Sequence, residues 1–439
     1  MTEIHHPEHP VRVVTATSLF DGHDAAINIM RRILQSQGAE VIHLGHNRSV
    51  AEGVWAAVQE DANAVAVSSY QGGHNEYFAY LVERLAQQGA SQVRVYGGGG
   101  GVIVPTEIEQ LASIGVRIFS PEDGARMGLA AMVNTIIAEC DRAPVTEVDT
   151  EGVLAGSEDA VAAALTAVEN GAGVPPELLE AASARPVPVL GITGTGGSGK
   201  SSLTDELLLR LRMDQQEKVR VAVLAVDPNR RRSGGALLGD RIRMNSIDTD
   251  RIHFRSVGTR GAISEVPDCV PDMVTVCKAA GADVVIVETP GIGQGDAAVT
   301  ELADVSLYVM TPEFGAPSQL EKIDMLDFAD AVAINKFERR GAADALRDVR
   351  RQMARNRESF GEDEAMPVFG TIAARFNDDG VTSLYQYLRT LLAAQGLVVD
   401  AGTLEPVEGR VPSDLSVLLP TERTRYLAEV AEAVRGYHA

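Results

Sequence analysis

Short apolar runs alternate with amphipathic stretches along the first third of the chain. The run 11–19 is apolar and rich in β-branched residues, which predicts a strand. In residues 24–37 the apolar side chains recur at near-helical spacing, which predicts a helix. Strand and helix patterns keep alternating up to residue 140. Such alternation predicts a parallel sheet with helices on both faces, and residues 11–140 form the first predicted domain.

A second α/β pattern occupies residues 189–395 and forms the second predicted domain. Its predicted strands are 189–192, 219–226, 284–287, 305–310, 331–334 and 367–372. Residues 141–188 contain several prolines around two short helical patterns, so we predict a partly helical linker there. Residues 396–439 form a second predicted linker, which closes in an amphipathic helix over 421–437.

Charge and composition narrow the functions that this α/β chain could serve. The net charge of −22 disfavours binding to nucleic acid by phosphate neutralisation. No apolar run approaches the roughly 18 residues of a membrane span, and the N-terminus has no apolar signal segment. The three cysteines show no CxxC or zinc spacing, which indicates a reducing compartment. We therefore expect a cytoplasmic protein with neither a membrane nor a nucleic-acid partner.

The clearest motif lies at the start of the second domain. The run from Gly194 to Ser201 matches GxxxxGK[ST] in full, between a predicted strand and a predicted helix. Glycines let backbone N–H groups turn inward around a phosphate, and the helix N-terminus adds its dipole. Lys200 is expected to reach the β- and γ-phosphates as a catalytic group, and Ser201 to coordinate Mg²⁺. The residues predicted here to bind nucleotide are Gly197, Ser198, Gly199, Lys200, Ser201 and Ser202. The alternative is a glycine-rich turn with an incidental lysine.

Two further segments of the second domain fall in the order that a GTPase needs. The apolar strand 283–288 ends in Glu288, where a metal-associated carboxylate belongs, so Glu288 is the second predicted catalytic residue. A later segment resembles the guanine-reading NKxD signature, with Glu in place of Asp, and consists of Asn335, Lys336, Phe337 and Glu338. Because a carboxylate accepts hydrogen bonds from the N–H edge of guanine, which adenine cannot offer, GTP is favoured over ATP. The alternative is an exposed Asn-Lys loop.

Polar and glycine-rich loops follow three predicted strands of the first domain. The first loop contains Asp21 and His23, the second follows Ser68, and the third is the five-glycine run 97–101. The carboxyl ends of parallel strands share one sheet edge, where ligands of such folds bind. A neutral imidazole is a good ligand for cobalt-like ions, and Asp21 could hold the other ring nitrogen. A solvated or capping histidine and a flexible glycine turn are the alternatives.

Together these loops resemble the cobalamin-binding domain of methylmalonyl-CoA mutase and its relatives, whose pattern is DxHxxG, then SxL, then GG. The resemblance implies a flavodoxin-like parallel-sheet fold. It also implies that His23 is the lower axial ligand of the cobalt and that Asp21 orients it. The cofactor tail is then expected to lie beside Ser68, Gly97 and Gly98.

Two positions in these loops depart from that family pattern. Ala26 stands where the family has glycine, and Tyr70 stands where it has leucine. The alanine adds one methyl group near the loop, and the tyrosine changes the expected shape of the tail cavity. Neither departure removes the expected cobalt ligand.

The stretch 191–338 resembles the metallochaperone-related GTPases that serve adenosylcobalamin-dependent acyl-CoA mutases. The resemblance implies that Arg243 faces the nucleotide. It further implies a Mg²⁺ and switch network, with Val226 contributing through its backbone, made of Ser201, Val226, Asp227, Asp240, Glu288 and Thr289. Taken alone, Asp240 and Arg243 could equally form a surface ion pair on a loop.

The order of cobalamin domain, linker and P-loop GTPase domain resembles the N-terminal part of the fused isobutyryl-CoA mutase family. In that family an acyl-CoA-binding barrel follows, and this chain stops where that barrel is expected. The resemblance implies a homodimeric G-protein chaperone that hydrolyses GTP with Mg²⁺ and gates adenosylcobalamin loading for an isobutyryl-CoA or methylmalonyl-CoA type mutase. Carbon-skeleton isomerisation is expected only with the barrel, in cis or as a separate chain.

Two other classes of function stay open at this stage. One is a cobalamin-binding module of a methyltransferase or regulator, in which the GTPase serves another purpose. The other is a GTPase that inserts a metal into a hydrogenase or urease, a class that usually carries a His- or Cys-rich loading stretch. The cluster of His5, His6 and His9 is short and terminal for that role.

Overall fold

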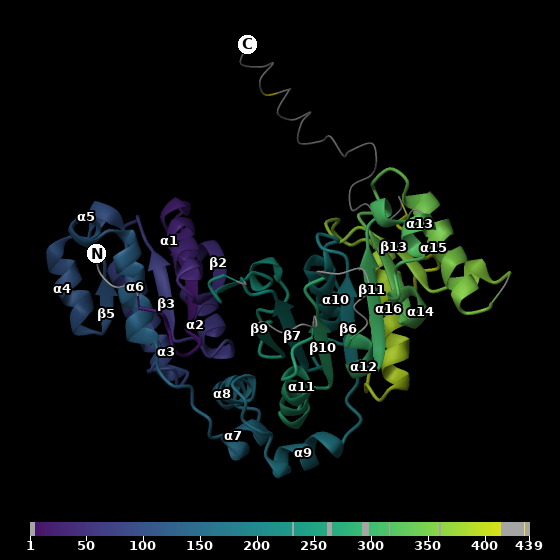
Figure 1. Cartoon of the computed structure of the whole chain (residues 1–439), viewed down its shortest axis with the longest axis horizontal. Coiled ribbons are helices and arrows are strands. Elements are labelled where there is room, and N and C mark those ends of the chain that lie inside the picture. Colours follow the sequence, from purple (N-terminus) through teal and green to yellow (C-terminus); the bar gives the residue numbers. More distant parts are fainter. Residues whose placement is uncertain are drawn as a thin grey trace.

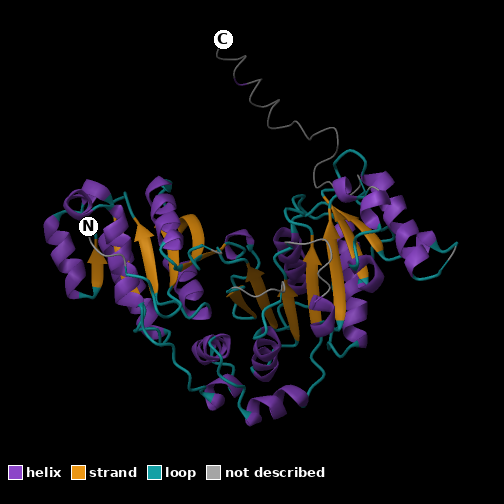
Figure 2. Cartoon of the chain, viewed as in Figure 1, coloured by secondary structure: helices purple, strands orange, loops and turns teal. Residues whose placement is uncertain are grey.

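Two α/β lobes make up the computed structural model, each built on its own sheet (Figure 1, Figure 2). The structure describes residues 5–413 except 231, 261–265, 292–297, 316 and 360, together with residue 434. The predicted helix over 421–437 therefore lies outside the described residues apart from that one position. None of the described helices combines the length and apolar character that crossing a bilayer requires.

The first lobe has the parallel sheet that the alternating pattern predicts. Its strands follow the order β5-β4-β3-β1-β2 and are β1 (Arg12–Ser18), β2 (Glu40–Arg48), β3 (Ala64–Ser68), β4 (Arg94–Gly98) and β5 (Val116–Ile118). One face is covered by α2 (Val50–Gln59), α3 (His74–Gln87) and α4 (Pro105–Ser113). The other face is covered by α1 (Ala25–Ser36) and α6 (Leu129–Cys140). Between β4 and α6 lie the short η1 (Gly100–Val102) and α5 (Pro121–Met127). The flavodoxin-like fold class is thus confirmed.

A sixth strand of this sheet comes from far along the chain. The short β8 (Ala236–Leu238) pairs in parallel with β2, in the register Glu40↔Ala236 to Ile42↔Leu238. Gly235 makes the approach possible, because a Cβ there would lie 2.2 Å from the carbonyl oxygen of Gln35. A segment of the predicted GTPase domain therefore completes the sheet of the first lobe.

The linker between the lobes is partly helical, as its pattern predicts. Its helices are α7 (Thr150–Leu154), α8 (Glu158–Glu169) and α9 (Pro176–Ser183), which run below the two lobes in Figure 1. Their apolar side chains, among them Leu165 and Leu178, share a buried cluster with Val270 and Met273 of α11 (Val270–Ala279). The linker is therefore packed onto the second lobe.

The second lobe is a seven-stranded sheet in the order β13-β12-β11-β6-β10-β7-β9. The strands are β6 (Val189–Gly194), β7 (Val221–Asp227), β9 (Ile252–Gly258), β10 (Val284–Glu288), β11 (Val305–Met310), β12 (Ala331–Asn335) and β13 (Val368–Thr371). The helices beside α11 are α10 (Lys200–Asp214), η2 (Arg241–Arg243), α12 (Ala298–Leu302), η3 (Pro312–Phe314), α13 (Pro317–Leu320), α14 (Met325–Phe328), α15 (Ala342–Asn356), η4 (Asp363–Ala365) and α16 (Asp379–Ala394). Strand β9 is absent from the sequence prediction, because its interior carries charged side chains.

Those charges belong to a buried ion network between the lobes. Arg12 of β1 contacts Glu40 of β2 at 2.9 Å and Glu169 of the linker at 3.1 Å. Arg255 of β9 contacts Glu169 at 2.8 Å, and Arg260 contacts Glu40 at 2.8 Å. Burial raises the pKa of Glu40, but the charges of Arg12 and Arg260 outweigh it and lower that pKa to about 2. The carboxylate therefore stays ionised inside the junction.

A second buried contact joins the lobes close to β8. Arg241 of η2 donates to the Gln59 side chain at 2.8 Å and to Glu60 at 3.3 Å, at the C-terminal end of α2. The Glu60 carboxylate also accepts from the backbone N–H and hydroxyl of Ser256 in β9, at 3.0 and 2.8 Å. The segment 236–243 is therefore bonded to the first lobe at two points, through β8 and through Arg241.

Candidate functional site

The phosphate loop lies between β6 and α10, in the strand–loop–helix arrangement that its motif requires. Gly199 precedes the helix with φ +89°, and a Cβ there would lie 2.6 Å from the side-chain nitrogen of Asn335. The position therefore demands glycine. The buried ammonium of Lys200 donates to the carbonyl oxygen of Gly194 at 3.1 Å, so it lies within the loop that its backbone forms.

A cluster of carboxylates lies beside the first turn of α10. The Ser201 hydroxyl contacts Asp240 at 2.8 Å and Glu288 at 2.7 Å, and Thr204 donates to Glu288 at 2.8 Å. Burial and the charge of Asp240 raise the pKa of Asp227 to about 8. The same two causes raise the pKa of Glu288 to about 7. Three like charges held this close favour a cation among them, which fits Mg²⁺.

The described side chains do not complete a metal shell by themselves. Among the described residues, no three His, Cys, Asp or Glu side chains converge closely enough to enclose a metal ion. Mg²⁺ in nucleotide sites keeps several waters and takes phosphate oxygens, so an incomplete protein shell is the arrangement that it needs. The Ser201 hydroxyl and the nearby carboxylates are the groups that would hold it here.

Most of the predicted nucleotide and metal residues surround one cavity of about 300 Å³. These residues are Gly197, Gly199, Lys200, Ser201, Ser202, Asp227, Asp240, Arg243, Glu288 and Thr289. Arg243 forms the ion pair with Asp240 that the alternative interpretation expected, at 2.9 Å, yet it also lines this cavity. Val226 has its side chain in the apolar core of β7, so a role for it rests on its backbone alone.

The predicted base-reading segment is fastened to the phosphate loop. Asn335, at the end of β12, donates to the carbonyl oxygen of Ser198 at 2.8 Å. Lys336 has φ +58° and donates to the carbonyl oxygen of Gly197 at 2.7 Å. Phe337 packs against Gly370, where a Cβ would lie 2.6 Å from the ring, and Glu338 is exposed. These contacts argue against a free Asn-Lys loop and place the segment where a base bound to this loop would be read.

In the first lobe, His23 and Asp21 form a hydrogen-bonded pair in the loop after β1. Nδ1 of His23 lies 2.7 Å from the Asp21 carboxylate, and the backbone N–H of His23 and that of Tyr70 donate to the same carboxylate. Burial raises the pKa of Asp21, but the hydrogen bonds from Tyr70 and His23 outweigh it and lower that pKa below its usual range. Because an ionised carboxylate can only accept, Nδ1 of His23 carries its proton toward Asp21, and Nε2 is left free of this hydrogen bond. The His23 side chain is 74% exposed, so Nε2 is the nitrogen offered to a metal.

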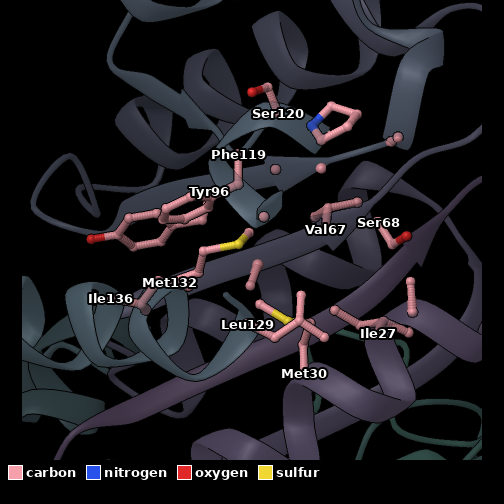
Figure 3. A pocket seen from close by; sticks show the side chains of 18 of the residues that line it. Ile27, Met30, Val67, Ser68, Tyr96, Phe119, Ser120, Leu129, Met132 and Ile136 are labelled. Carbon is pink, nitrogen blue, oxygen red and sulfur yellow. The ribbon is translucent and has the colours of Figure 1, made fainter. Parts of the chain in front are cut away.

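An apolar cavity of about 220 Å³ lies beside this loop, between the sheet and helices α1 and α6. Figure 3 shows Ser68 at one side and Tyr96 at the opposite side of it, with Ile27 and Met30 along its lower side in this view. Gly97 and Gly98 line the same cavity, as the sequence predicts for the cofactor tail. A Cβ on Gly97 would lie 2.5 Å from the Phe78 ring, so glycine is required there. The aromatic base at the end of a cobalamin tail would fit this lining.

The two departures from the family pattern also lie at this cavity. Ala26 and Tyr70 are both among the lining residues. The Tyr70 ring lies 3.0 Å from the position that a Cβ on Gly100 would take, and 5.8 Å from the imidazole of His23, centre to centre. Tyr70 therefore shapes the end of the cavity nearest the histidine.

Sequence reasoning missed one hydroxyl of the nucleotide site and all of the junction between the lobes. Thr204 lies one helical turn after Ser201, and that spacing is a signal that could have placed it on the same face. The contacts of Arg241 with Gln59 and Glu60 join segments more than 180 positions apart, so no local sequence pattern predicts them.

The fold and the two sites define a class of protein: a P-loop GTPase domain joined to a cobalamin-binding domain. The family described as "Methylmalonyl Co-A mutase-associated GTPase MeaB" matches residues 161–402, and the "B12 binding domain" matches residues 11–130. Because the first match covers more than half of the chain, the chain belongs to the MeaB family of GTPases. The predicted classes of the two domains are thereby confirmed.

Among individual proteins, two relatives align with both domains of this chain. The chain is 65% identical to "Fused isobutyryl-CoA mutase" of Nocardia farcinica, over 99% of this chain and 41% of the relative. It is 60% identical to the protein of the same name from Cupriavidus metallidurans, over 98% of this chain and 40% of the relative. "GTPase ArgK" of Escherichia coli is 37% identical over 34% of this chain and 44% of its own length. The solved "LAO/AO transport system kinase" covers 56% of this chain and 76% of its own, at 25% identity and a TM-score of 0.39.

These matches confirm the resemblance to the fused isobutyryl-CoA mutases and show how much of those proteins the chain covers. The chain spans about two fifths of the length of the curated mutase relatives that it matches. Alignment of both domains with one relative favours a cobalamin-linked GTPase over a methyltransferase module or a metal-insertion GTPase.

Replacing Asp227 with asparagine is expected to stabilise the metal-free protein. The substitution removes one of three clustered negative charges, and the amide oxygen can still accept the Gly239 N–H at 2.8 Å. At a pH above about 8, where the wild-type carboxyl is ionised, we expect the melting temperature in EDTA to rise by about 2–4 °C. Thermal melts with and without Mg²⁺ and GDP measure this, and the variant should lose the stabilisation by Mg²⁺. A lower melting temperature in EDTA than that of an Asp250→Asn control would contradict the role of Asp227.

Proposed function

We propose that this chain binds adenosylcobalamin through His23 and hydrolyses GTP with Mg²⁺, and that the GTPase gates cofactor loading for an acyl-CoA mutase. The observation that carries the proposal is the exposed imidazole of His23, held by the buried Asp21, 5.8 Å from the ring of Tyr70, which lines an apolar cavity. In the same chain, a phosphate loop and a carboxylate cluster surround a second cavity that suits a nucleotide and its metal ion.

The residues of each site have separate tasks in this function. Asp21 holds and orients the imidazole of His23, and the glycines of the loop 97–101 leave room for the cofactor tail. Lys200 neutralises charge on the phosphates, and Ser201 with Asp227, Asp240 and Glu288 holds the metal ion. Bound adenosylcobalamin supplies a cobalt–carbon bond whose homolysis starts radical rearrangements.

The segment 236–243 supports communication between the two sites. Strand β8 lies in the sheet that carries the cobalamin loops, while Asp240, two residues later, contacts Ser201 of the phosphate loop. A change in metal or γ-phosphate at Asp240 would therefore act on a segment bonded to β2 and, through Arg241, to α2. We infer that this segment transmits the nucleotide state to the cobalamin lobe.

The proposed partner and reaction follow from the names of the relatives. Their common description as fused isobutyryl-CoA mutases favours a barrel that binds acyl-CoA as the partner, in cis or as a separate chain. Isomerisation of an isobutyryl-CoA or methylmalonyl-CoA type substrate is then the reaction that the loaded cofactor serves. A homodimer in the cytoplasm is the expected setting.

A visible-absorption titration with adenosylcobalamin tests the first half of this proposal. We expect the wild type to bind the cofactor with an imidazole in the lower position, and His23→Ala to bind it without that ligand, because the apolar cavity still takes the tail. A His6→Ala variant, altered at an exposed terminal histidine, should give the wild-type spectrum. Absence of binding by the wild type would refute the proposed cofactor. A wild-type spectrum from His23→Ala would refute its ligand.

A further inference from the structure

Phe20 has an unusual backbone conformation for a bulky side chain. It follows β1 with φ +65°, in the left-handed region that glycine and asparagine prefer. Among the described non-glycine residues with positive φ, Phe20 is the one aromatic side chain. Its side chain is also 75% exposed. Folding alone favours neither feature, because a glycine would relieve the backbone and a polar side chain would suit the solvent.

A hydrogen bond to the neighbouring strand β2 holds Phe20 in this conformation. Its backbone N–H donates to the side-chain oxygen of Asn47 at 2.7 Å, and Asn47 has φ +57° itself. Asn47 lies in β2, at the same sheet edge as the end of β1. The hydrogen bond and the two left-handed backbones therefore fix the point from which the Phe20 side chain leaves the loop. Strain that the surrounding structure maintains in this way is typical of binding sites.

The loop separates its side chains into an inner and an outer set. Asp21 is fully buried and accepts hydrogen bonds, whereas Phe20 and His23 on either side of it are largely exposed. Tyr70 lies beside the His23 ring at 5.8 Å. The exposed phenyl ring thus stands three residues from the imidazole that would ligate cobalt.

We propose that the Phe20 ring packs against the corrin macrocycle of the bound cobalamin, as a binding residue that the fold positions in advance. This inference rests on the proposed function, because it takes His23 as the ligand of the cobalt. The corrin is a broad, flat ring edged with methyl groups, and it extends well beyond the cobalt–imidazole axis. An exposed apolar ring on a backbone that is already held, three residues before His23, gains burial on binding without a cost for ordering the loop.

The test uses adenosylcobalamin and adenosylcobinamide, which keeps the corrin and lacks the nucleotide tail. We expect Phe20→Ala to weaken binding of both compounds by about tenfold, because both bury the ring to the same extent. Phe20→Gly should weaken binding similarly, while it raises the melting temperature of the unliganded protein by relieving the backbone. The matched control is Phe376→Ala, which removes a phenyl ring of 72% exposure from the second lobe and should bind as the wild type does.

Each other outcome overturns the inference in a distinct way. Unchanged affinity in Phe20→Ala would assign the ring to another occupant, such as the mutase barrel or a second copy of the chain. A loss confined to adenosylcobalamin would mean that Phe20 acts on the tail and not on the corrin. A lower melting temperature in Phe20→Gly would make the ring a structural element. Absence of binding by the wild type itself would refute the proposed cofactor before Phe20 is considered.

Discussion

Lys200→Ala is expected to lower kcat/KM for GTP hydrolysis by about 100- to 1,000-fold, the usual loss when one group that stabilises transition-state charge is removed. The Lys200 ammonium is buried inside the phosphate loop, 3.1 Å from the carbonyl oxygen of Gly194, and Lys200 lines the cavity that would hold the phosphates. Steady-state GTP hydrolysis, followed by phosphate release, measures the effect. Lys218→Ala provides the control, since Lys218 is exposed and pairs with Asp400 on the surface.

The same Lys200 variant tests whether hydrolysis is connected to cofactor loading. With the mutase barrel supplied, we expect Lys200→Ala to abolish the GTP-dependent transfer of adenosylcobalamin. Normal transfer in a variant that no longer hydrolyses GTP would contradict the gating role. A loss in kcat/KM of less than about tenfold would instead contradict the assignment of Lys200.

Arg241→Met is expected to destabilise the junction between the lobes by about 3 kcal/mol, or about 6–12 °C in melting temperature. The substitution removes the donor at 2.8 Å from Gln59 and leaves the fully buried Glu60 without its closest cation. Thermal or urea unfolding measures the change. Arg251→Met removes a half-buried arginine that pairs with the exposed Asp250 near the start of β9, and it should change the stability by less than about 1 kcal/mol.

Two further measurements on Arg241→Met distinguish a loss of communication between the lobes from a loss of stability. Trp55, the one tryptophan of the chain, lines a cavity of about 140 Å³ together with Arg241 and Ile242, so its fluorescence should respond to a GTP analogue with Mg²⁺. We expect that response to disappear in Arg241→Met. The double variant with Glu60→Gln should recover part of the lost stability, because no uncompensated charge remains. An unchanged Trp55 response in Arg241→Met would show that the nucleotide state does not pass through Arg241.

Local patterns in the sequence predicted the two sheets well, and they placed the phosphate loop between a strand and a helix, as the structure has it. Strands buried on both faces appear as continuous apolar runs, as in β6 and β10, and the phosphate loop carries its own spacing signature. The loop with Asp21 and His23 was placed at a sheet edge by the rule that ligands bind at the carboxyl ends of parallel strands. These features depend on residues close together in the chain, so a single sequence contains them.

Features that depend on distant partners escaped prediction. Strand β9 lacks an apolar strand pattern, because Arg255 and Ser256 are bonded to carboxylates of the linker and the first lobe. No local pattern indicates those distant partners. Strand β8 has only three residues, and it is a strand because β2 offers it hydrogen bonds. The strained turn at Phe20 depends on Asn47, which lies 27 positions away.

The pairing of β8 with β2 changes what a truncated version of this protein would be. A piece ending near residue 140 would keep the histidine loop but lose Ala236–Leu238, and β2 would become an uncovered edge strand. Its free N–H and C=O groups would then be open to pairing with another molecule. Cutting the chain at the apparent domain boundary therefore invites aggregation or strand exchange. For a cobalamin lobe produced alone, a peptide of residues 233–240 added in trans should restore the strand that pairs with β2.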